Sequence, residues 1–209
     1  MPAPSEPSTA PLSRDELQRA LALPVLDAAG TSAPLASHLA AGTPTLLVLV
    51  RHHHCGMCIE YCRTLWEQLA PATHDAQRPK LLVVGHGEAR GIASYKERSG
   101  WLGEMVVDPT RKVFGALGCV SGLLNAPEKQ PAYLEKHSTA SLVLRSAGQM
   151  LRSGPLGIWR GGDITQLGGE FLVDADGSPA YTHRMRNTVD HTEVPELAKL
   201  LGVDAQPAA

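Results

Sequence analysis

The sequence predicts an α/β domain with a central mixed sheet flanked by helices. Three apolar runs have the length and composition of buried strands, and a segment with helical spacing follows each: residues 45–50, 80–85 and 104–108. Crossovers between parallel strands need about a dozen residues or more, so this alternation predicts parallel strands with helices on both faces. Residues 168–183 predict a β-hairpin with an Asp-Gly turn, which adds antiparallel strands. Residues 195–201 predict a closing helix that ends at Gly202.

An N-terminal extension precedes this alternation. Ser13 and Glu16 have the spacing of a capping box, which predicts a short helix that ends before Pro24. A short strand over residues 23–26 and a turn of helix over 34–39, with proline at its start, follow it. These elements lead into the first buried strand.

The helices after the apolar runs are predicted from apolar spacing and from end signals. Residues 58–69 have apolar side chains every three to four positions, which is typical of an amphipathic helix. Residues 88–99 have the same period, and Gly100 is a plausible C-terminal stop. Asp108 as N-cap, with proline next to it, predicts a helix that runs through Leu117.

The ends of the chain and one internal segment do not fit the alternation. Residues 1–12 and 203–209 are rich in proline and alanine, so we expect disordered tails around one domain over 13–202. Between residues 119 and 165, helical spacing over 138–152 is followed by a stretch rich in glycine and proline. We therefore expect an insertion before the hairpin.

Composition limits the classes of partner. The 209 residues carry 19 Lys and Arg against 21 Asp and Glu, a net charge of -2 without a basic block, which argues against nucleic acid or an anionic membrane as the main partner. The apolar runs are shorter than the roughly 20 residues that cross a bilayer, and residues 1–12 lack the pattern of a secretion signal. We expect a soluble, cytoplasmic protein, monomer or homodimer, that acts on small molecules or other proteins.

The segment Arg51-His52-His53-His54-Cys55-Gly56-Met57-Cys58 carries the chemistry. It connects a buried strand to a helix, and a C-x-x-C pair at that junction is typical of a redox dithiol. Cys55 would face unsatisfied backbone N–H groups and the positive end of the helix dipole, both of which stabilise a thiolate, and Arg51 and His54 would add positive potential. Cys58, one turn later, would resolve a mixed disulfide or a sulfenic acid on Cys55.

The same sulfur atoms permit another use. Cys55, Cys58 and Cys62, together with His52–His54, include enough soft and borderline ligands for Zn(II) or Cu(I), so a metal-binding module is the alternative to an enzyme. We expect no metal or other cofactor in the dithiol enzyme. Cys62 and Cys119 occupy apolar positions without a partner motif, and we expect them to be buried and inert.

Three separated blocks, 50–61, 168–172 and 183–191, resemble the AhpC/TSA antioxidant-like group of the thioredoxin superfamily. Within it the chain is most similar to the peroxiredoxin-like, prostamide-synthase-related proteins, notably a branch common in fungi. The resemblance covers roughly residues 14–202. It implies a thioredoxin-like fold, a Cys55/Cys58 redox centre, a peroxide or disulfide substrate, and an external thiol reductant such as thioredoxin or glutathione. A biosynthetic catalyst on the same scaffold is a third possibility.

Two motifs of related proteins are missing. A peroxiredoxin has proline and threonine seven and three residues before its peroxidatic cysteine, and here these positions hold Val48 and His52. Thioredoxin has a cis-proline before its hairpin, where this chain has Leu167-Gly168-Gly169. We therefore expect substrate to dock differently.

The resemblance also covers polar residues near the end of the chain. It suggests that Arg184 faces the dithiol, where it would stabilise a thiolate or bind an anionic substrate, although a surface arginine on a hairpin fits equally well. We expect His183, Asp190 and His191 to form a solvated loop rather than a polar network.

Overall fold

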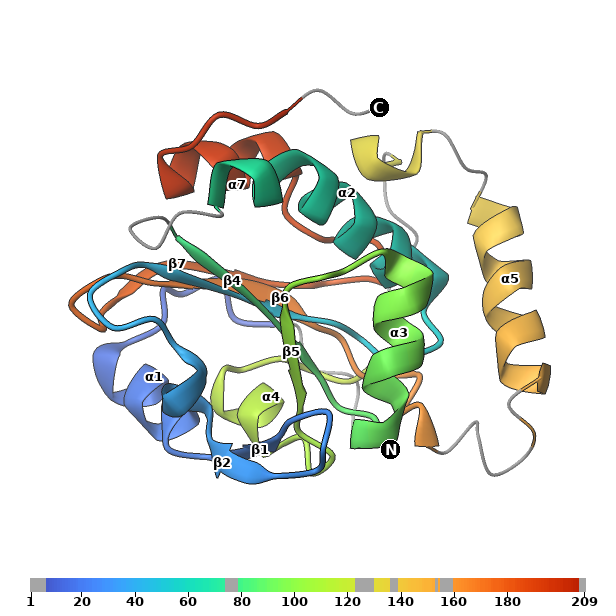
Figure 1. Cartoon of the computed structure of the whole chain (residues 1–209), viewed down its shortest axis with the longest axis horizontal. Helices are drawn as coiled ribbons and strands as arrows, with labels where there is room; N and C mark the ends of the chain where they lie inside the picture. Colours follow the sequence, from blue (N-terminus) through green and yellow to red (C-terminus); the bar gives the residue numbers. More distant parts are fainter. Residues whose placement is uncertain are drawn as a thin grey trace.

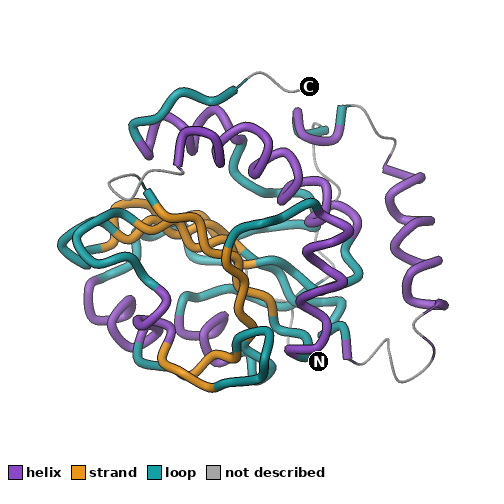
Figure 2. Tube along the Cα trace, in the orientation of Figure 1, coloured by secondary structure: helices purple, strands orange, loops and turns teal. Residues whose placement is uncertain are grey.

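The computed structural model describes residues 7–73, 79–122, 130–135, 139–152, 154 and 160–206. One seven-stranded sheet crosses the molecule in the order β2-β1-β5-β4-β3-β6-β7 (Figures 1 and 2). Its strands are β1 (Pro24–Leu26), β2 (Ser32–Pro34), β3 (Thr45–Leu49), β4 (Lys80–Gly85), β5 (Glu104–Val107), β6 (Gly169–Val173) and β7 (Pro179–Arg184). The predicted mixed sheet is confirmed.

Helices cover both faces of this sheet. The α-helices are α1 (Arg14–Leu21), α2 (Gly56–Thr73), α3 (Ile92–Ser99), α4 (Lys112–Ala116), α5 (Thr139–Arg152) and α7 (Val194–Leu201). Three 3₁₀ turns are η1 (Leu35–His38), η2 (Ala89–Gly91) and η3 (Ala132–Leu134). Figure 1 shows α2, α3 and α7 on one face, α1 and α4 on the other, and α5 outside the layer that contains α2 and α3.

Strand β3 occupies the centre of the sheet and is buried throughout. It pairs in parallel with β4, so that Leu46 faces Leu81, and antiparallel with β6, so that Leu46 also faces Leu172. Leu46 and Val48 point to the core under α2, whereas Leu47 and Leu49 point to the core under α1 and α4. Since both faces of the strand are covered, all five of its residues are buried, which explains the unbroken apolar run.

The insertion predicted between residues 119 and 165 leaves the fold at the end of α4 and returns at β6. An isolated antiparallel bridge between Ser121 and Gln166 closes its base, and α5 matches the helix predicted over 138–152. Most of the glycine- and proline-rich stretch that follows this helix lies outside the described residues.

Two helix starts differ from the sequence prediction. Helix α4 begins at Lys112 rather than after Asp108, because the Asp108 carboxylate accepts the backbone N–H groups of Thr110 and Val113 and holds a turn in between. Arg111, at a left-handed φ of 60°, connects this turn to the helix. The segment predicted as one helix over 88–99 begins with the η2 turn before α3 continues to Gly100, whose φ of 69° ends it as predicted.

The described parts of the predicted tails pack against the domain. Leu12 is buried in the core between α1 and the sheet. At the other end, the Gln206 backbone N–H donates to the Gln68 carbonyl of α2 at 2.9 Å, so the chain continues along this helix beyond Gly202. Residues 1–6 and 207–209 lie outside the described part. No described helix has the length and hydropathy of a membrane span.

Candidate redox site

Cys55 lies immediately before helix α2, and Cys58 lies in its first turn. The chain leaves β3 at Leu49, and the Cys55 carbonyl accepts the Ile59 N–H at 3.0 Å, which is the first helical hydrogen bond after the turn. Cys55 is 1% exposed and Cys58 is fully buried, and neither forms a disulfide. The strand-to-helix setting that the sequence predicts is therefore present, with the dithiol beneath the surface.

Arg51 supplies the positive charge beside Cys55. Its Nη1 donates to the Cys55 sulfur at 3.3 Å, and its Nη2 donates to the Ile164 carbonyl at 2.8 Å, which fixes the guanidinium. The pKa of Cys55 falls to about 5 because the Cys58 thiol donates a hydrogen bond to its sulfur, with a further contribution from the Arg51 charge, and together they outweigh the burial of the thiol. Burial, followed by the adjacent Cys55 thiolate, raises the pKa of Cys58 well above its ordinary value. The two cysteines are thus electrostatically distinct.

Cys58 also contacts a buried histidine, which in turn contacts a buried carboxylate. His191 Nε2 lies 3.5 Å from the Cys58 sulfur, and His191 Nδ1 lies 2.6 Å from a carboxylate oxygen of Glu170 on β6. Thr192 donates to the other oxygen of Glu170 through its N–H at 3.2 Å and its hydroxyl at 3.0 Å. Tyr61 of α2 stacks on the His191 ring, with centroids 4.0 Å apart and planes at 8°. Our expectation of a solvated loop is wrong for His191.

The sequence does contain a signal for this group. Glu170 is the one charged residue in the otherwise apolar strand segment Gly169-Glu170-Phe171-Leu172-Val173. A carboxylate in a buried strand requires partners, and the nearest candidates in the chain are the polar residues that follow the hairpin. What the sequence does not give is the chain path that returns His191 to Cys58.

Two of the three histidines before Cys55, His53 and His54, lie against different segments of the chain. A methyl group at Gly87 or Gly91 would meet the His53 ring within 2.6 Å, whereas one at Gly161 would meet the ring of His54 at 2.2 Å. Burial lowers the pKa of His53 to about 3 and lowers that of His52 also. Within the described part of the chain, no three His, Cys, Asp or Glu side chains are arranged to bind a metal ion, so the metal-binding alternative gains no support.

His54, which we expected to add positive potential, is buried at a small surface pocket of about 90 Å³. Arg98 and Arg145 also line this pocket, together with Gly56 at the start of α2. The contact that the structure places on the Cys55 sulfur comes from Arg51.

The structure places Arg184 away from the dithiol, which corrects the suggestion that it faces the site. Its Nε donates to the Leu117 carbonyl at 2.6 Å, and its Nη1 donates to the carbonyls of Ser8 and Ala10 at 3.0 and 2.8 Å. Its guanidinium lies over Phe171, which belongs to the core under α1 and α4. Arg184 therefore binds the N-terminal segment on the face of the sheet opposite to the dithiol.

The other two cysteines have the environment of inert thiols. Burial raises the pKa of both Cys62 and Cys119 to about 12. The Cys62 sulfur lies 3.4 Å from the Tyr95 hydroxyl, within the core. A thiol with such a pKa forms almost no thiolate at neutral pH, so neither residue competes with Cys55.

The insertion covers the dithiol. The Gly56 N–H, at the start of α2, donates to the Ser146 hydroxyl of α5 at 2.9 Å, and Leu142 of α5 is fully buried in the same core cluster as both cysteines. From η3, the Tyr133 hydroxyl donates to the Val189 carbonyl at 2.8 Å. Substrate must pass these elements to reach Cys55.

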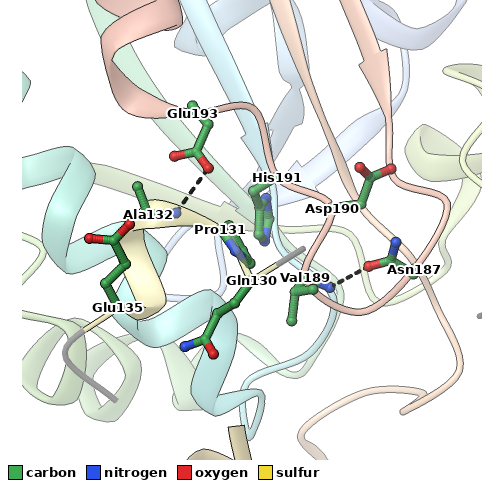
Figure 3. Close-up of a pocket in the computed structure, with 9 residues that line it drawn as sticks. All are labelled: Gln130, Pro131, Ala132, Glu135, Asn187, Val189, Asp190, His191 and Glu193. Carbon is green, nitrogen blue, oxygen red and sulfur yellow. Dashed lines mark hydrogen bonds between the residues drawn. The ribbon is translucent and has the colours of Figure 1, made fainter. Parts of the chain in front are cut away.

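A pocket of about 280 Å³ lies between η3 and the loop after β7 (Figure 3). Glu135, Asp190 and Glu193 make its lining acidic. His191 borders it, although the imidazole itself is inaccessible to water. His191 therefore lies between this pocket and Cys58.

Known proteins are similar to this chain in sequence and in fold. Human peroxiredoxin-like 2C is 31% identical over 204 residues, which cover 97% of this chain and 86% of that protein, and the bovine protein of that name is 30% identical over 96% and 86%. Among solved structures, the thiol peroxidase from Chromobacterium violaceum has a TM-score of 0.50 at 18% identity, over 86% of this chain and 82% of that one. Peroxidoxin BcpB from Mycobacterium tuberculosis has a TM-score of 0.51 at 14% identity, over 86% and 89%. The two structures support the fold alone.

The model of the AhpC/TSA antioxidant enzyme family matches residues 64–187, more than half of the chain. The match begins after Cys55 and Cys58, and the relatives named here are mammalian, so the fungal branch is not confirmed. The family model, the peroxiredoxin-like relatives and the thioredoxin-like sheet agree, and the chain belongs to the AhpC/TSA antioxidant enzyme family, with a thiol redox role.

Proposed function

We propose that this protein is a thiol oxidoreductase in which Cys55 attacks an oxidised substrate and Cys58 resolves the product. The observation that carries the proposal is the pair of contacts on the Cys55 sulfur, from the Cys58 thiol and from Arg51 at 3.3 Å, at the start of α2. A thiolate is the nucleophile in such reactions, and these contacts keep Cys55 ionised at neutral pH.

With a disulfide substrate, the Cys55 thiolate forms a bond to one substrate sulfur while the substrate S–S bond breaks and the other sulfur leaves as a thiolate. Cys58 then displaces the bound half, which leaves a Cys55–Cys58 disulfide and two reduced substrate thiols. With a peroxide, Cys55 takes one oxygen as a sulfenic acid and releases an alcohol or water, and Cys58 then expels water. In both cases two electrons from an external thiol, such as thioredoxin or glutathione, restore the dithiol.

The environment of the dithiol supports an oxidised sulfur compound as substrate more directly than a peroxide. The position three residues before Cys55 holds His52, whose ring is buried, so the hydroxyl that orients a peroxide in peroxiredoxins has no counterpart there. Thiol–disulfide exchange requires a thiolate and a resolving thiol, and the C-x-x-C pair supplies both once the substrate has passed α5 and reached Cys55.

Thiol counting and intact mass spectrometry test this proposal. Reduced protein is treated with one equivalent of hydrogen peroxide or of a small aromatic disulfide, for the wild type and for Cys55→Ser, Cys58→Ser and Cys119→Ser. We expect the wild type and Cys119→Ser to lose two thiols and the mass of two hydrogen atoms. Cys58→Ser stops at a mixed disulfide or a sulfenic acid on Cys55, and Cys55→Ser reacts far more slowly. Equal thiol loss in wild type and Cys55→Ser would contradict the proposal.

A further inference from the structure

The resolving thiol is the less reactive partner of the pair. Cys58 is fully buried, and its sulfur must lose a proton before it attacks the mixed disulfide on Cys55. Bulk water does not reach this sulfur. The acceptor must therefore come from the protein, and His191 Nε2 lies 3.5 Å from the sulfur.

We propose that His191, oriented by Glu170, is the general base that takes the Cys58 proton during resolution and returns it when the disulfide is reduced. This inference rests on the proposed function and adds a catalytic residue, His191, and a positioning residue, Glu170. In this arrangement His191 touches the reacting sulfur, whereas Glu170 acts only through the imidazole.

Glu170 determines which imidazole nitrogen faces the sulfur as an acceptor. A carboxylate 2.6 Å from Nδ1 holds a hydrogen on that nitrogen, which leaves the Nε2 lone pair directed at the Cys58 S–H. The two bonds from Thr192 hold the carboxylate, and the stacked Tyr61 ring holds the plane of the imidazole. The group therefore needs little reorganisation when the proton moves.

In the resolving step the Cys58 sulfur forms a bond to the Cys55 sulfur, and the bond between Cys55 and the substrate sulfur breaks. The electron pair of that bond leaves with the substrate thiolate. The Cys58 proton moves to His191 Nε2, and the imidazolium then gives it up to the departing thiolate or to water. The dithiol is oxidised by two electrons, the substrate disulfide is reduced to two thiols, and His191 returns to its neutral form.

The experiment is a pH-jump measurement of resolution. A mixed disulfide between Cys55 and an aromatic thiol is formed from 5,5′-dithiobis(2-nitrobenzoate) at mildly acidic pH, where resolution by Cys58 is slow. A jump to neutral pH then releases the second aromatic thiolate when Cys58 attacks, and its colour reports the first-order rate. His191→Asn keeps a donor toward Glu170 and removes the acceptor at Cys58. Glu170→Gln keeps the size of the side chain and removes its charge.

We expect His191→Asn to slow release of the second thiolate by about 100-fold, within the usual range for general base catalysis, and to leave the first release within about twofold of wild type. Glu170→Gln should slow the second release by about tenfold, because the imidazole keeps a partner but loses the carboxylate charge. His183→Asn is the matched control: this histidine lies 4.0 Å from Glu170 but makes its 2.6 Å contact with the Asp190 carbonyl, and its second release should match wild type.

The pH profile separates a base from a merely structural histidine. The titratable and charged groups that face Cys58 and His191 are Arg51, Tyr61, Cys62, Tyr95, Tyr133, Glu170, His183 and Asp190. Burial raises the pKa of the three tyrosines and of Cys62, and Cys55 no longer titrates in the mixed disulfide, so none of these five groups changes charge near neutrality. The pH profile of His183→Asn accounts for His183. In the wild type the second rate should depend only weakly on pH in neutral and mildly alkaline solution, because the base is part of the protein. In His191→Asn the rate should rise up to tenfold with each pH unit, because Cys58 must then lose its proton before it attacks.

Three outcomes are distinguishable. Release of a single equivalent by wild type contradicts the proposed function itself. If wild type releases two equivalents of thiolate, and His191→Asn keeps the wild-type second rate and pH profile, the role of His191 is overturned while the proposed function stands. If His191→Asn loses its near-ultraviolet circular dichroism, the variant Glu170→Gln provides the test. A second release in Glu170→Gln that is as fast as in wild type would overturn the positioning role of Glu170.

Discussion

Replacing Arg51 with methionine tests the electrostatic origin of the reactive thiolate. The guanidinium donates to the Cys55 sulfur at 3.3 Å and is buried beside it, so water screens the interaction little. A hydrogen bond to a charged group contributes about 1.5–3 kcal/mol, and one pKa unit corresponds to about 1.4 kcal/mol. Loss of Arg51 should therefore raise the pKa of Cys55 by about 1–2 units. The hydrogen bond from Cys58 remains in the variant, so the pKa should stay below its ordinary value.

Ultraviolet absorbance of the thiolate, followed through a pH titration of the reduced protein, measures this shift. Cys62 and Cys119, with pKa values of about 12, and Cys58, with its raised pKa, are silent in acidic and neutral solution. Arg51→Lys is the control, since it keeps a positive charge and should shift the midpoint less. A midpoint within about half a unit of wild type in Arg51→Met would refute the assignment of Arg51.

The same low pKa predicts how stability depends on pH. Because the pKa of Cys55 is about 5 in the fold and 9.0 in a free thiol, the unfolded state binds more protons between these values. Stability should rise with pH through this window, by at most about 1.4 kcal/mol per unit, and the gain is lost as pH falls toward 5. Urea unfolding of wild type and Cys55→Ser should diverge as pH rises. Parallel curves would contradict the depressed pKa.

Three further predictions concern the cover, the sheet and acid stability. Leu142→Ala should speed alkylation of Cys55 by about tenfold or more, because it removes buried contacts that hold α5 over the dithiol, whereas Leu144→Ala, 72% exposed on the same helix, should not. Gly168→Ala should destabilise the fold by about 3 kcal/mol or more in urea, because its methyl group would lie 1.8 Å from a carbonyl of β3; wild-type stability would contradict that contact. Burial lowers the pKa of His53 to about 3, so the unfolded state binds more protons than the folded state below about pH 6.5. Between pH 7 and pH 5, the free energy of unfolding should therefore fall by about 2 kcal/mol less in His53→Asn than in wild type, as urea unfolding measures it.

The sequence predicts the sheet and the dithiol because both are encoded locally. An apolar run as short as Thr45–Leu49 implies a strand covered on both faces, and a C-x-x-C pair at its end implies a helix start. Gly100 and Gly202 end their helices as predicted, each with a positive φ. The start of α4 is predicted wrongly because Asp108 caps a turn as readily as a helix, and only the local backbone chooses between them.

Arg184 and His191 illustrate what the sequence leaves open. Arg184 is the last residue of β7 and His191 follows seven residues later, and both belong to the block 183–191 that resembles the family. The alternation of side chains along β7 and the path of the loop after it decide that Arg184 contacts the N-terminal segment, while His191 returns to Cys58. A shift of one residue in the register would exchange the faces.

The sequence by itself determined the class of fold and the position of the dithiol at a strand-to-helix junction, and it led to the hypothesis that Cys55 is the thiolate. These follow from short-range periodicity and from the chemistry of residues three positions apart. The tertiary structure alone decided that His191, in contact with Glu170, lies beside Cys58, that Arg184 does not, and that α5 covers the pair. The contacts of Cys58 with His191 and of Gly56 with Ser146 join residues 133 and 90 positions apart, and they depend on register, burial and chain path rather than on local pattern.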